Sequence, residues 1–337
     1  MGSQDVYCAI CSGPFGGAIK IRKPEDNPDE HYDPELIDGT DFEWIRELRC
    51  LGLNHYDEGV TRAFLSGRGT YSYGFSLEVE VRGEDPNEPS KDERPLYELY
   101  LDMFDDPVFP FHEACYALLA RSLYDSADPA CIDKDVLYKV MHELVDGTTL
   151  RLDYGELLGA DQFWYSHPGE EYIACNPSVK HGNNAALQAM LHNKALLHRP
   201  PPLDLSARIP TDPFAALPYD VIHTLTTYLD TLSTFSLLKA SPYILHFTTP
   251  NPTFWKRMIR WEFFHWYPEA ASFFACTEFP EGFDFKGAYL WLREVTAPVV
   301  GLKGEFMGVA NRKRIWNACT ELGDYYIEEI NREDQGE

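Results

Sequence analysis

The sequence predicts an α+β fold, in which a mixed region with a small antiparallel sheet and helices is followed by a group of further helices. Apolar and polar residues alternate over 75–81 and 97–103, which predicts two half-buried strands paired across the polar loop between them. Apolar residues at helical spacing dominate the chain after residue 214. Prolines at 200, 201, 202, 210 and 213 indicate a linker between the two parts.

Length and composition allow these parts to fold separately. A chain of 337 residues with 44% hydrophobic and 14% aromatic residues can bury a sizeable core and can hold more than one domain. We expect an N-terminal α+β domain over 1–198, a proline-rich linker over 199–213, a helical motif over 214–262 and a mostly helical region over 263–337.

The charge of the chain excludes several classes of partner. Fifty-four acidic residues against 29 basic ones give a net charge of −25. Such a surface repels phosphate backbones and anionic lipid headgroups, so nucleic acid and membranes are not expected partners. The chain has no apolar run long enough for a membrane helix and no secretory signal at its start. We therefore expect an intracellular protein of the cytoplasm or nucleus, whose eight cysteines are thiols or metal ligands.

Two pairs of residues, far apart in the chain, indicate a metal site. Cys8-Ala-Ile-Cys11, with a glycine two positions later, predicts a tight turn whose backbone amides point at two thiolates. His112 and Cys115 open a helix that we expect after Pro110, and their spacing places both side chains on one helical face. Together the four side chains form a Cys3His set, which is typical of a closed structural zinc site.

Alternatives to this interpretation stay open. The cysteine pair could be free thiols or a redox pair, although nothing around Cys8 resembles the strand and helix of a thioredoxin-like unit. In that case His112 would only start a helix and Cys115 would belong to the core. His31 or Cys50 could also supply the fourth ligand. If zinc binds, closing a loop of about a hundred residues restricts the unfolded chain on the order of a disulfide.

Local patterns predict further elements of the N-terminal region. We expect a helix that begins at Thr40 or Asp41, and its apolar stripe consists of Trp44, Ile45, Leu48 and Leu51. The glycine-rich residues 66–74 are interpreted as a turn, because the Gly-Lys-Ser/Thr ending of a phosphate-binding loop is absent. Another helix follows Asp133 as its cap.

Two clusters are interpreted as structural. The aromatic residues Phe163, Trp164 and Tyr165 are expected to fill core beneath a loop, although such clusters also anchor partners. The basic run of Arg312, Lys313 and Arg314 lies near the start of the last long helix, and we expect it on a solvated face.

The stretch 217–260 carries the strongest functional signal. Pro218 suits a helix start, and the apolar stripe that follows it ends at Asp230, which can cap a second helix. Pro242 ends this helix or opens a short turn, and Asn251 can cap a third helix. A unit this small has more apolar side chains than it can hide, so part of its surface is expected to await a partner.

This stretch resembles an F-box. The resemblance rests on the opening Leu217-Pro218-x-Asp220-Val221-Ile222, the junction Tyr228-Leu229-Asp230, the run Leu237-Leu238-Lys239-Ala240-Ser241 and the closing Phe254-Trp255-Lys256. It covers roughly 45 residues, the length of a motif of three short helices. Membership of this family implies docking on a Skp-type adaptor, which would link the chain to a cullin ubiquitin ligase.

The resemblance and the apolar pattern together give a set of expected adaptor-binding residues. They are Leu217, Pro218, Val221, Ile222, Leu225, Tyr228, Leu229, Leu232, Phe235 and Leu237. In such ligases the chemistry belongs to other subunits, so the expected role is a non-catalytic substrate receptor for an unknown protein target. The alternative is a metal-dependent enzyme, in which Cys8, Cys11 and His112 would hold a catalytic zinc with an open position for water.

Overall fold

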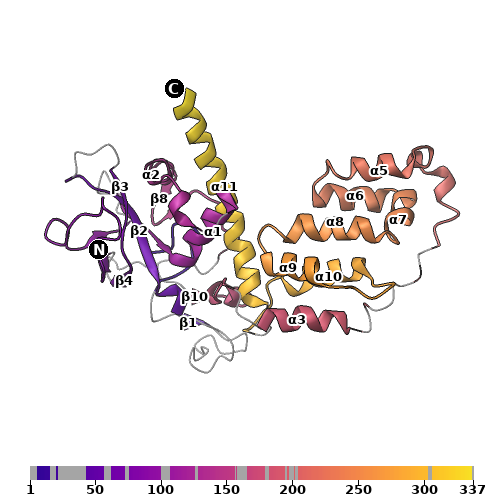
Figure 1. The fold of residues 1–337 in the computed structure, drawn as a ribbon, viewed down its shortest axis with the longest axis horizontal. Coiled ribbons are helices and arrows are strands. Elements are labelled where there is room, and N and C mark those ends of the chain that lie inside the picture. The colour runs from indigo at the N-terminus through magenta and orange to yellow at the C-terminus, as the bar shows by residue number, and fades with distance from the viewer. Residues whose placement is uncertain are drawn as a thin grey trace. The chain divides into compact units, whose positions relative to one another are not determined.

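The computed structural model divides the chain into two compact units. Unit 1 comprises Met1–Val179 together with Ala297–Glu337, and unit 2 comprises Lys180–Thr296. The structure describes residues 6–15, 20–21, 43–56, 62–72, 76–99, 107–125, 128–155, 157, 165–178, 182–193, 196, 201, 204–302 and 306–335. The expected α+β class is confirmed, with the sheet in the N-terminal part (Figure 1).

A curled, six-stranded antiparallel sheet organises unit 1. Its central strand β2 (Leu48–Leu53) pairs with β7 (Phe109–His112), β3 (Ala63–Leu65) and the start of β4 (Gly69–Ser72). Strand β5 (Ser76–Val79) pairs with β4 and also with β6 (Tyr97–Glu98), which confirms the expected pairing for these residues, whereas residues 75 and 100–103 of the two expected strands lie outside the described residues. An isolated parallel bridge pairs Leu99, next to β6, with Val108, next to β7.

The helix expected from Thr40 or Asp41 onward is wrong. The structure has a short 3-10 helix, η2 (Glu43–Ile45), and then the strand β2. The apolar residues at 44, 45, 48 and 51 fit a helical stripe, but β2 is flanked by strands and buries residues on both faces. A short apolar run inside a sheet carries no strict alternation, and sequence periodicity alone cannot separate it from a helix.

Helices cover the sheet of unit 1 (Figure 1). Helix α11 (Met307–Gln335) contacts α1 (Glu113–Tyr124), α2 (Lys134–Glu143) and η4 (Glu171–Ala174). The side chain of Asp133 accepts from the backbone N–H groups of Asp135 and Val136, which confirms the expected cap of α2. The remaining short elements are β1 (Lys20–Ile21) with its parallel partner β10 (Tyr165–Ser166), η3 (Pro129–Cys131), and the hairpin of β8 (Val145–Asp146) and β9 (Thr149–Leu150).

Unit 2 is built from helices in its described part. After η5 (Ile209–Thr211) and η6 (Pro213–Ala216) come α5 (Tyr219–Leu225), α6 (Thr231–Ala240), α7 (Pro242–Thr248) and α8 (Pro252–Phe263). The unit also contains α3 (Gly182–Leu191), α9 (Pro268–Cys276) and α10 (Phe285–Val295). The stretch that resembles an F-box therefore holds one helix more than the three expected, because Ser241 caps the extra helix α7 by accepting from Ile244 N.

The expected caps of α6 and α8 are confirmed. The carboxylate of Asp230 accepts from Ser233 N at 2.6 Å, and the amide oxygen of Asn251 accepts from Thr253 N and Phe254 N at 2.9 and 3.3 Å. Helices α8 and α10 share a core rich in aromatic rings, in which Trp255 of α8 packs against Tyr289 of α10 at 5.5 Å between ring centroids. Local capping groups thus set where each helix of unit 2 begins.

The units divide the chain differently from the expected domains. The region expected to be a single C-terminal part, 263–337, is split: α9 and α10 belong to unit 2, whereas α11 belongs to unit 1. The basic run at the start of α11 also differs from expectation, because Arg312 and Arg314 are buried and not solvated. Of the expected aromatic cluster, Phe163 and Trp164 lie outside the described residues, and Tyr165 begins β10. No helix in the described part of the chain is long and apolar enough to cross a membrane.

Candidate metal centre and docking surface

A tight turn holds the first two cysteines. Cys8 N donates to Gly13 O at 2.9 Å and Ser12 N donates to Cys8 O at 2.7 Å, while Ser12 adopts a φ of 51°. Gly13 N donates to the sulfur of Cys11 at 3.3 Å. A Cβ atom at position 13 would lie 3.2 Å from that sulfur, so glycine lets the turn close tightly around it.

The other two residues stand where a strand becomes a helix. His112 ends β7 and occupies the N-cap position of α1, and Cys115 lies in the first turn of that helix. The turn of Cys8 reaches this junction through a hydrogen bond from Ala9 N to Pro110 O at 2.8 Å. The backbone N–H of His112 also lies 3.5 Å from the sulfur of Cys8. Backbone N–H groups at a helix start favour negative charge, which suits thiolates.

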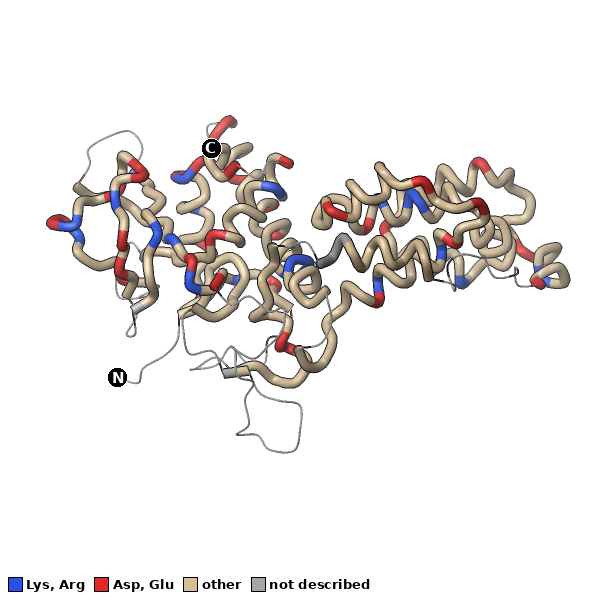
Figure 2. The backbone as a smooth tube through the Cα atoms, turned by 60° about the horizontal axis from the view of Figure 1, so that its bottom comes forward, with Lys and Arg blue, Asp and Glu red and all other residues tan. Residues whose placement is uncertain are grey.

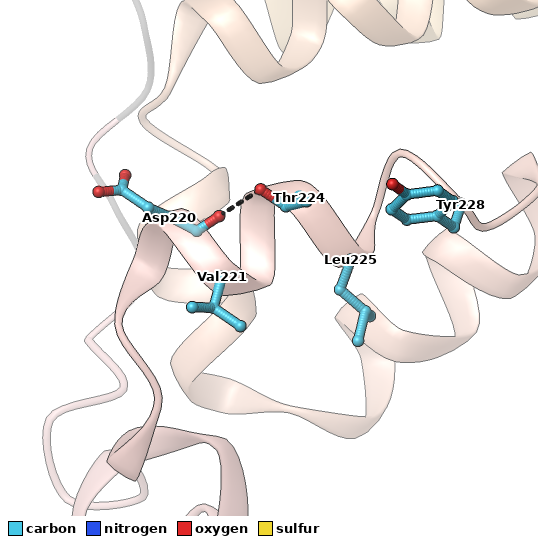
Figure 3. Close-up of a pocket in the computed structure, with 5 residues that line it drawn as sticks. All are labelled: Asp220, Val221, Thr224, Leu225 and Tyr228. Carbon is cyan, nitrogen blue, oxygen red and sulfur yellow. Dashed lines mark hydrogen bonds between the residues drawn. The ribbon is translucent and has the colours of Figure 1, made fainter.

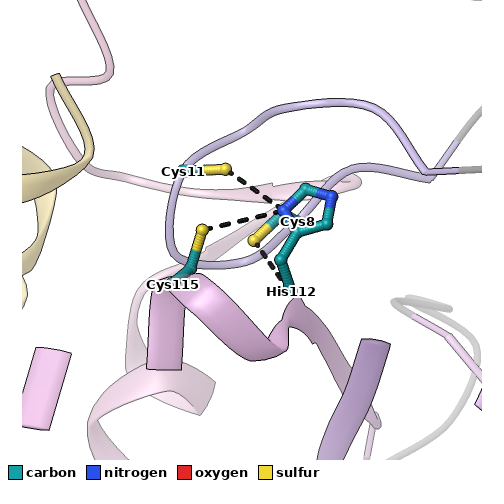
Figure 4. A group of neighbouring side chains, drawn as sticks. All are labelled: Cys8, Cys11, His112 and Cys115. Carbon is teal, nitrogen blue, oxygen red and sulfur yellow. Dashed lines mark hydrogen bonds between the residues drawn. The ribbon is translucent and has the colours of Figure 1, made fainter. Parts of the chain in front are cut away.

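The four side chains converge in the interior of unit 1 (Figure 4). All four are buried, and their potential ligand atoms lie within 4.8 Å of one another. The Nδ1 atom of His112 lies 3.6 Å from the sulfur of Cys11 and 3.7 Å from that of Cys115. The predicted convergence is confirmed, and this group could hold a metal ion.

The competing ligands do not join this group in the described structure. Cys50 is buried on β2, where its sulfur lies 3.5 Å from the hydroxyl of Ser66. Burial raises the pKa of Cys50 to about 12, as expected of an inert core thiol. His31 lies outside the described residues.

The imidazole of His112 is oriented for ligation. Its Nε2 atom lies 3.0 Å from the carbonyl oxygen of Pro14, which can only accept, so Nε2 carries the proton and donates. Nδ1 is then the unprotonated nitrogen, and it faces the sulfurs. A backbone carbonyl that fixes the tautomer in this way is a common partner of metal-binding histidines.

The electrostatics of the three thiols differ from those of isolated cysteines. Burial raises the pKa of Cys8 and Cys115 well above the usual value, and hydrogen bonding to Cys11 adds to the effect. Burial alone would also raise the pKa of Cys11, but hydrogen bonds from Cys115, Cys8 and His112 hold it well below its usual range. The group therefore favours negative charge at Cys11, and a cation is needed before all three thiols can ionise together.

Other residues that support the turn carried no signal in the sequence. The hydroxyl of Tyr154 donates to Ala9 O at 2.9 Å. From α11, the side-chain amide of Asn311 donates to the carbonyls of Ile173 and Cys175 at 2.9 and 2.8 Å, and Arg314 donates to Cys11 O. Only covariation or a structure could reveal these contacts, because they join segments that are distant in the chain.

A second feature, on unit 2, is a stripe of exposed apolar side chains, which we call the docking stripe. It consists of Leu217, Val221, Leu225, Tyr228 and Leu232. Tyr228 is 84% exposed and Leu232 76% exposed, which is unusual for large apolar side chains spaced at helical intervals. Asp220, Val221, Thr224, Leu225 and Tyr228 line a shallow groove of about 460 Å³. Figure 3 shows Val221 and Leu225 pointing to the same side of α5.

The structure sorts the expected adaptor-binding residues into accessible and inaccessible ones. Pro218 is exposed together with the docking stripe, and Leu229, Phe235 and Leu237 are half-buried. Ile222 is fully buried in the core of unit 2, so it cannot contact a partner. Ile222 follows Val221 directly in α5, so a helix that exposes one of these two neighbours turns the other inward.

The segment that leads into the docking stripe is held in place. The buried carboxylate of Asp212 accepts from Ser241 Oγ at 2.7 Å, Phe214 N at 2.9 Å and Tyr243 N at 3.0 Å. The hydroxyl of Tyr243 donates to Leu217 O at 3.0 Å. These contacts fix the path of residues 212–218 against the start of α7.

The two units also differ in charge (Figure 2). Unit 2 contains ten acidic and ten basic residues, so its net charge is zero. Unit 1 contains the other 44 acidic and 19 basic residues and therefore carries the whole net charge of −25. The docking stripe thus belongs to the neutral unit, and the Cys/His group belongs to the acidic one.

Comparisons with known proteins add no relative. No family profile, curated protein or solved structure matches this chain.

Proposed function

We propose that the chain is a non-catalytic substrate receptor that docks through unit 2 on a Skp-type adaptor of a cullin ubiquitin ligase. The observation that carries the proposal is the docking stripe. Its residues lie on the segment whose motifs resemble an F-box, and they are exposed where a self-contained helical unit would bury them. An amphipathic helix that places such residues in a partner's groove is a known mode of recognition.

The division of labour within unit 2 supports docking. Ile222, Leu238 and Ile244 are buried and hold α5, α6 and α7 together, so the stripe is not needed for the core. Asp212 and Tyr243 fix the entry to α5 before any partner binds. A preordered surface loses less conformational entropy on association, which favours affinity.

We further propose that the Cys/His group of unit 1 binds a structural zinc ion. Cys8, Cys11 and Cys115 would supply sulfur and His112 would supply Nδ1, which completes a tetrahedral set without a position for water. Zinc bound there would supply folding energy and would join the N-terminal turn to the β7–α1 junction. A closed set of four protein ligands is consistent with a receptor in which unit 1 presents a protein target and performs no chemistry.

Co-purification tests the docking proposal. In the full chain, Leu217 and Pro218 are changed together to Ala, and a tagged protein is used to capture the adaptor. We expect the double variant to lose the adaptor while it keeps its zinc and the thermal transition of unit 1. The matched control is Leu290→Ala, which removes an exposed leucine of α10 outside the stripe.

One result would contradict the docking proposal. If the double variant captures the adaptor at the wild-type level, residues 217 and 218 do not contribute to docking and the proposed docking site is wrong. Metal analysis of the same preparations tests the zinc proposal separately, with about one zinc per chain expected.

A further inference from the structure

A buried arginine lies beside the metal centre without an anionic partner in the described structure. Arg314, on α11, is only 8% exposed. Its Nη1 donates to Cys11 O, while Nε and Nη2 donate to the side-chain oxygen of Asn311 at 3.2 and 3.1 Å. Both acceptors are neutral, and no described carboxylate forms an ion pair with Arg314. The buried carboxylate of Glu171 does not pair with Arg314 either. One of its oxygens accepts from Gly169 N, and the other has no hydrogen-bond partner.

An isolated buried charge is expensive. The guanidinium of an arginine carries a full positive charge in proteins, so its burial places that charge in the interior. Hydrogen bonds to neutral oxygens satisfy its N–H groups but leave its charge uncompensated in a low-dielectric interior. The burial of Arg314 therefore calls for a negative charge close by.

The Cys/His group supplies that charge when a divalent ion is bound. Three thiolates, one neutral imidazole and a divalent cation have a net charge of −1, which one guanidinium neutralises. The guanidinium lies near the group, because a Cβ atom built at Gly13 would lie 3.2 Å from the sulfur of Cys11 and 3.8 Å from Nη2 of Arg314, which places these two atoms no more than about 7 Å apart.

We propose that Arg314 is the counter-ion of the metal centre. This inference rests on the zinc site proposed above and assigns it a further residue from the opposite end of the chain. Arg314 does not ligate the metal: it offsets the negative charge of the loaded site and holds the Cys11 carbonyl, and is thus a positioning residue. A Cys3His site with this counter-ion is selective for a divalent ion, since only that charge gives a neutral interior.

Zinc affinity of the full chain, measured by competition with a chromogenic chelator, tests the inference. We expect Arg314→Gln, which keeps a donor but removes the charge, to weaken zinc binding by about 10- to 100-fold, the usual cost of losing an outer-shell partner. Arg314→Lys keeps the charge and should remain within about threefold of wild type. The matched control is Arg312→Gln, because Arg312 is also buried on the same helix but donates to Pro177 O.

A second pair of variants separates charge from structure. Cys115→His makes the loaded site a neutral Cys2His2 set, which has no need of a counter-ion. In that background Arg314→Gln should leave zinc affinity unchanged or increase it, whereas a merely structural role for Arg314 predicts the same loss in both backgrounds. Equal losses would overturn the inference, as would wild-type affinity in Arg314→Gln.

The remaining outcomes also support or contradict the counter-ion role of Arg314. If Arg314→Gln does not fold, or if Cys115→His binds no zinc, the lysine variant decides alone, and a loss of affinity beyond tenfold in Arg314→Lys contradicts the counter-ion. If the wild-type chain itself binds no zinc, the proposed zinc site fails and takes this inference with it. Zinc in wild type without any dependence on Arg314 rejects only the counter-ion.

Discussion

Unit 1 and unit 2 treat their distinctive side chains in opposite ways. Unit 1 buries its Cys/His group completely, and it brings that group together from segments about a hundred residues apart. Unit 2 leaves a continuous apolar stripe in solvent and builds it from one short stretch of chain. On the functions proposed above, the first feature serves the fold of its own unit, whereas the second is covered by another molecule.

The largest effect should follow from removing a metal ligand. Cys115→Ala is expected to abolish zinc binding and the cooperative unfolding transition of unit 1, because a structural zinc contributes ~10 kcal/mol or more to folding. Unit 2 contains none of the four ligands, so its helices should persist. Zinc analysis and calorimetry on the full chain measure both effects.

The matched control is Cys131→Ala, which removes an exposed cysteine of the same unit. It should keep the zinc and the transition. If Cys115→Ala unfolds no more readily than this control, the Cys/His group does not stabilise unit 1.

The next largest effect concerns the docking stripe. Leu225→Asp places a charge in the groove of α5 and is expected to weaken binding of a purified Skp-type adaptor by about thirtyfold, or ~2 kcal/mol, as for a buried hot-spot residue. Folding should be unaffected, because Leu225 is 39% exposed in the free chain. Titration calorimetry with the full chain gives the affinity, and Leu290→Asp, at 46% exposure on α10, serves as the comparison. Similar losses from both variants would show a general surface effect.

A smaller effect should come from the carboxylate that positions the stripe. Asp212→Asn removes a charged acceptor of three hydrogen bonds and is expected to destabilise unit 2 by about 1 kcal/mol. Burial alone would raise the pKa of Asp212, but the N–H of Tyr243, the hydroxyl of Ser241 and the N–H of Phe214 hold it below its usual value.

The same residue predicts a pH dependence. Because the folded pKa of Asp212 lies below its unfolded value, its contribution is complete above the unfolded pKa and is lost as the pH falls through the folded pKa. Urea unfolding followed between pH 6 and 3 should show this loss for wild type at the acid end and a flatter profile for Asp212→Asn. Parallel profiles would contradict the assignment.

The smallest effect should be the response to salt. Unit 1 carries the net charge of −25, so repulsion among its acidic side chains destabilises its folded state, whereas unit 2 has no net charge. Raising the salt concentration shortens the Debye length to a few ångströms at about 1 M, so the melting temperature of unit 1 should rise by a few degrees while that of unit 2 changes less. Equal shifts of both calorimetric transitions would remove the electrostatic distinction.

The sequence predicted what depends on residue type and local spacing. The pairs Cys8/Cys11 and His112/Cys115 could be predicted because few residue types ligate zinc, and the caps Asp230 and Asn251 because they satisfy backbone donors next to them. The docking stripe was predicted in part. Periodicity marked the apolar residues of α5, but it could not tell that Ile222 faces the core while Val221 faces solvent.

The predictions that were wrong concern residues whose position is set by contacts between segments distant in the chain. The apolar residues of β2 suit both a helix and a strand, and the pairing of β2 with β7 decides in favour of a strand. The burial of Arg314 could not be foreseen, since its acceptor Cys11 O lies 303 residues away in the sequence. Contacts between distant segments also decide the place of α11, which follows unit 2 in the chain but packs on α1 and belongs to unit 1.

Hydrogen exchange of the full chain, with and without a purified Skp-type adaptor, is the decisive measurement for docking. We expect the adaptor to slow amide exchange over Leu217–Leu232 and to leave exchange around the Cys/His group of unit 1 unchanged. Unaltered exchange across this stretch at saturating adaptor, or protection confined to unit 1, would contradict it.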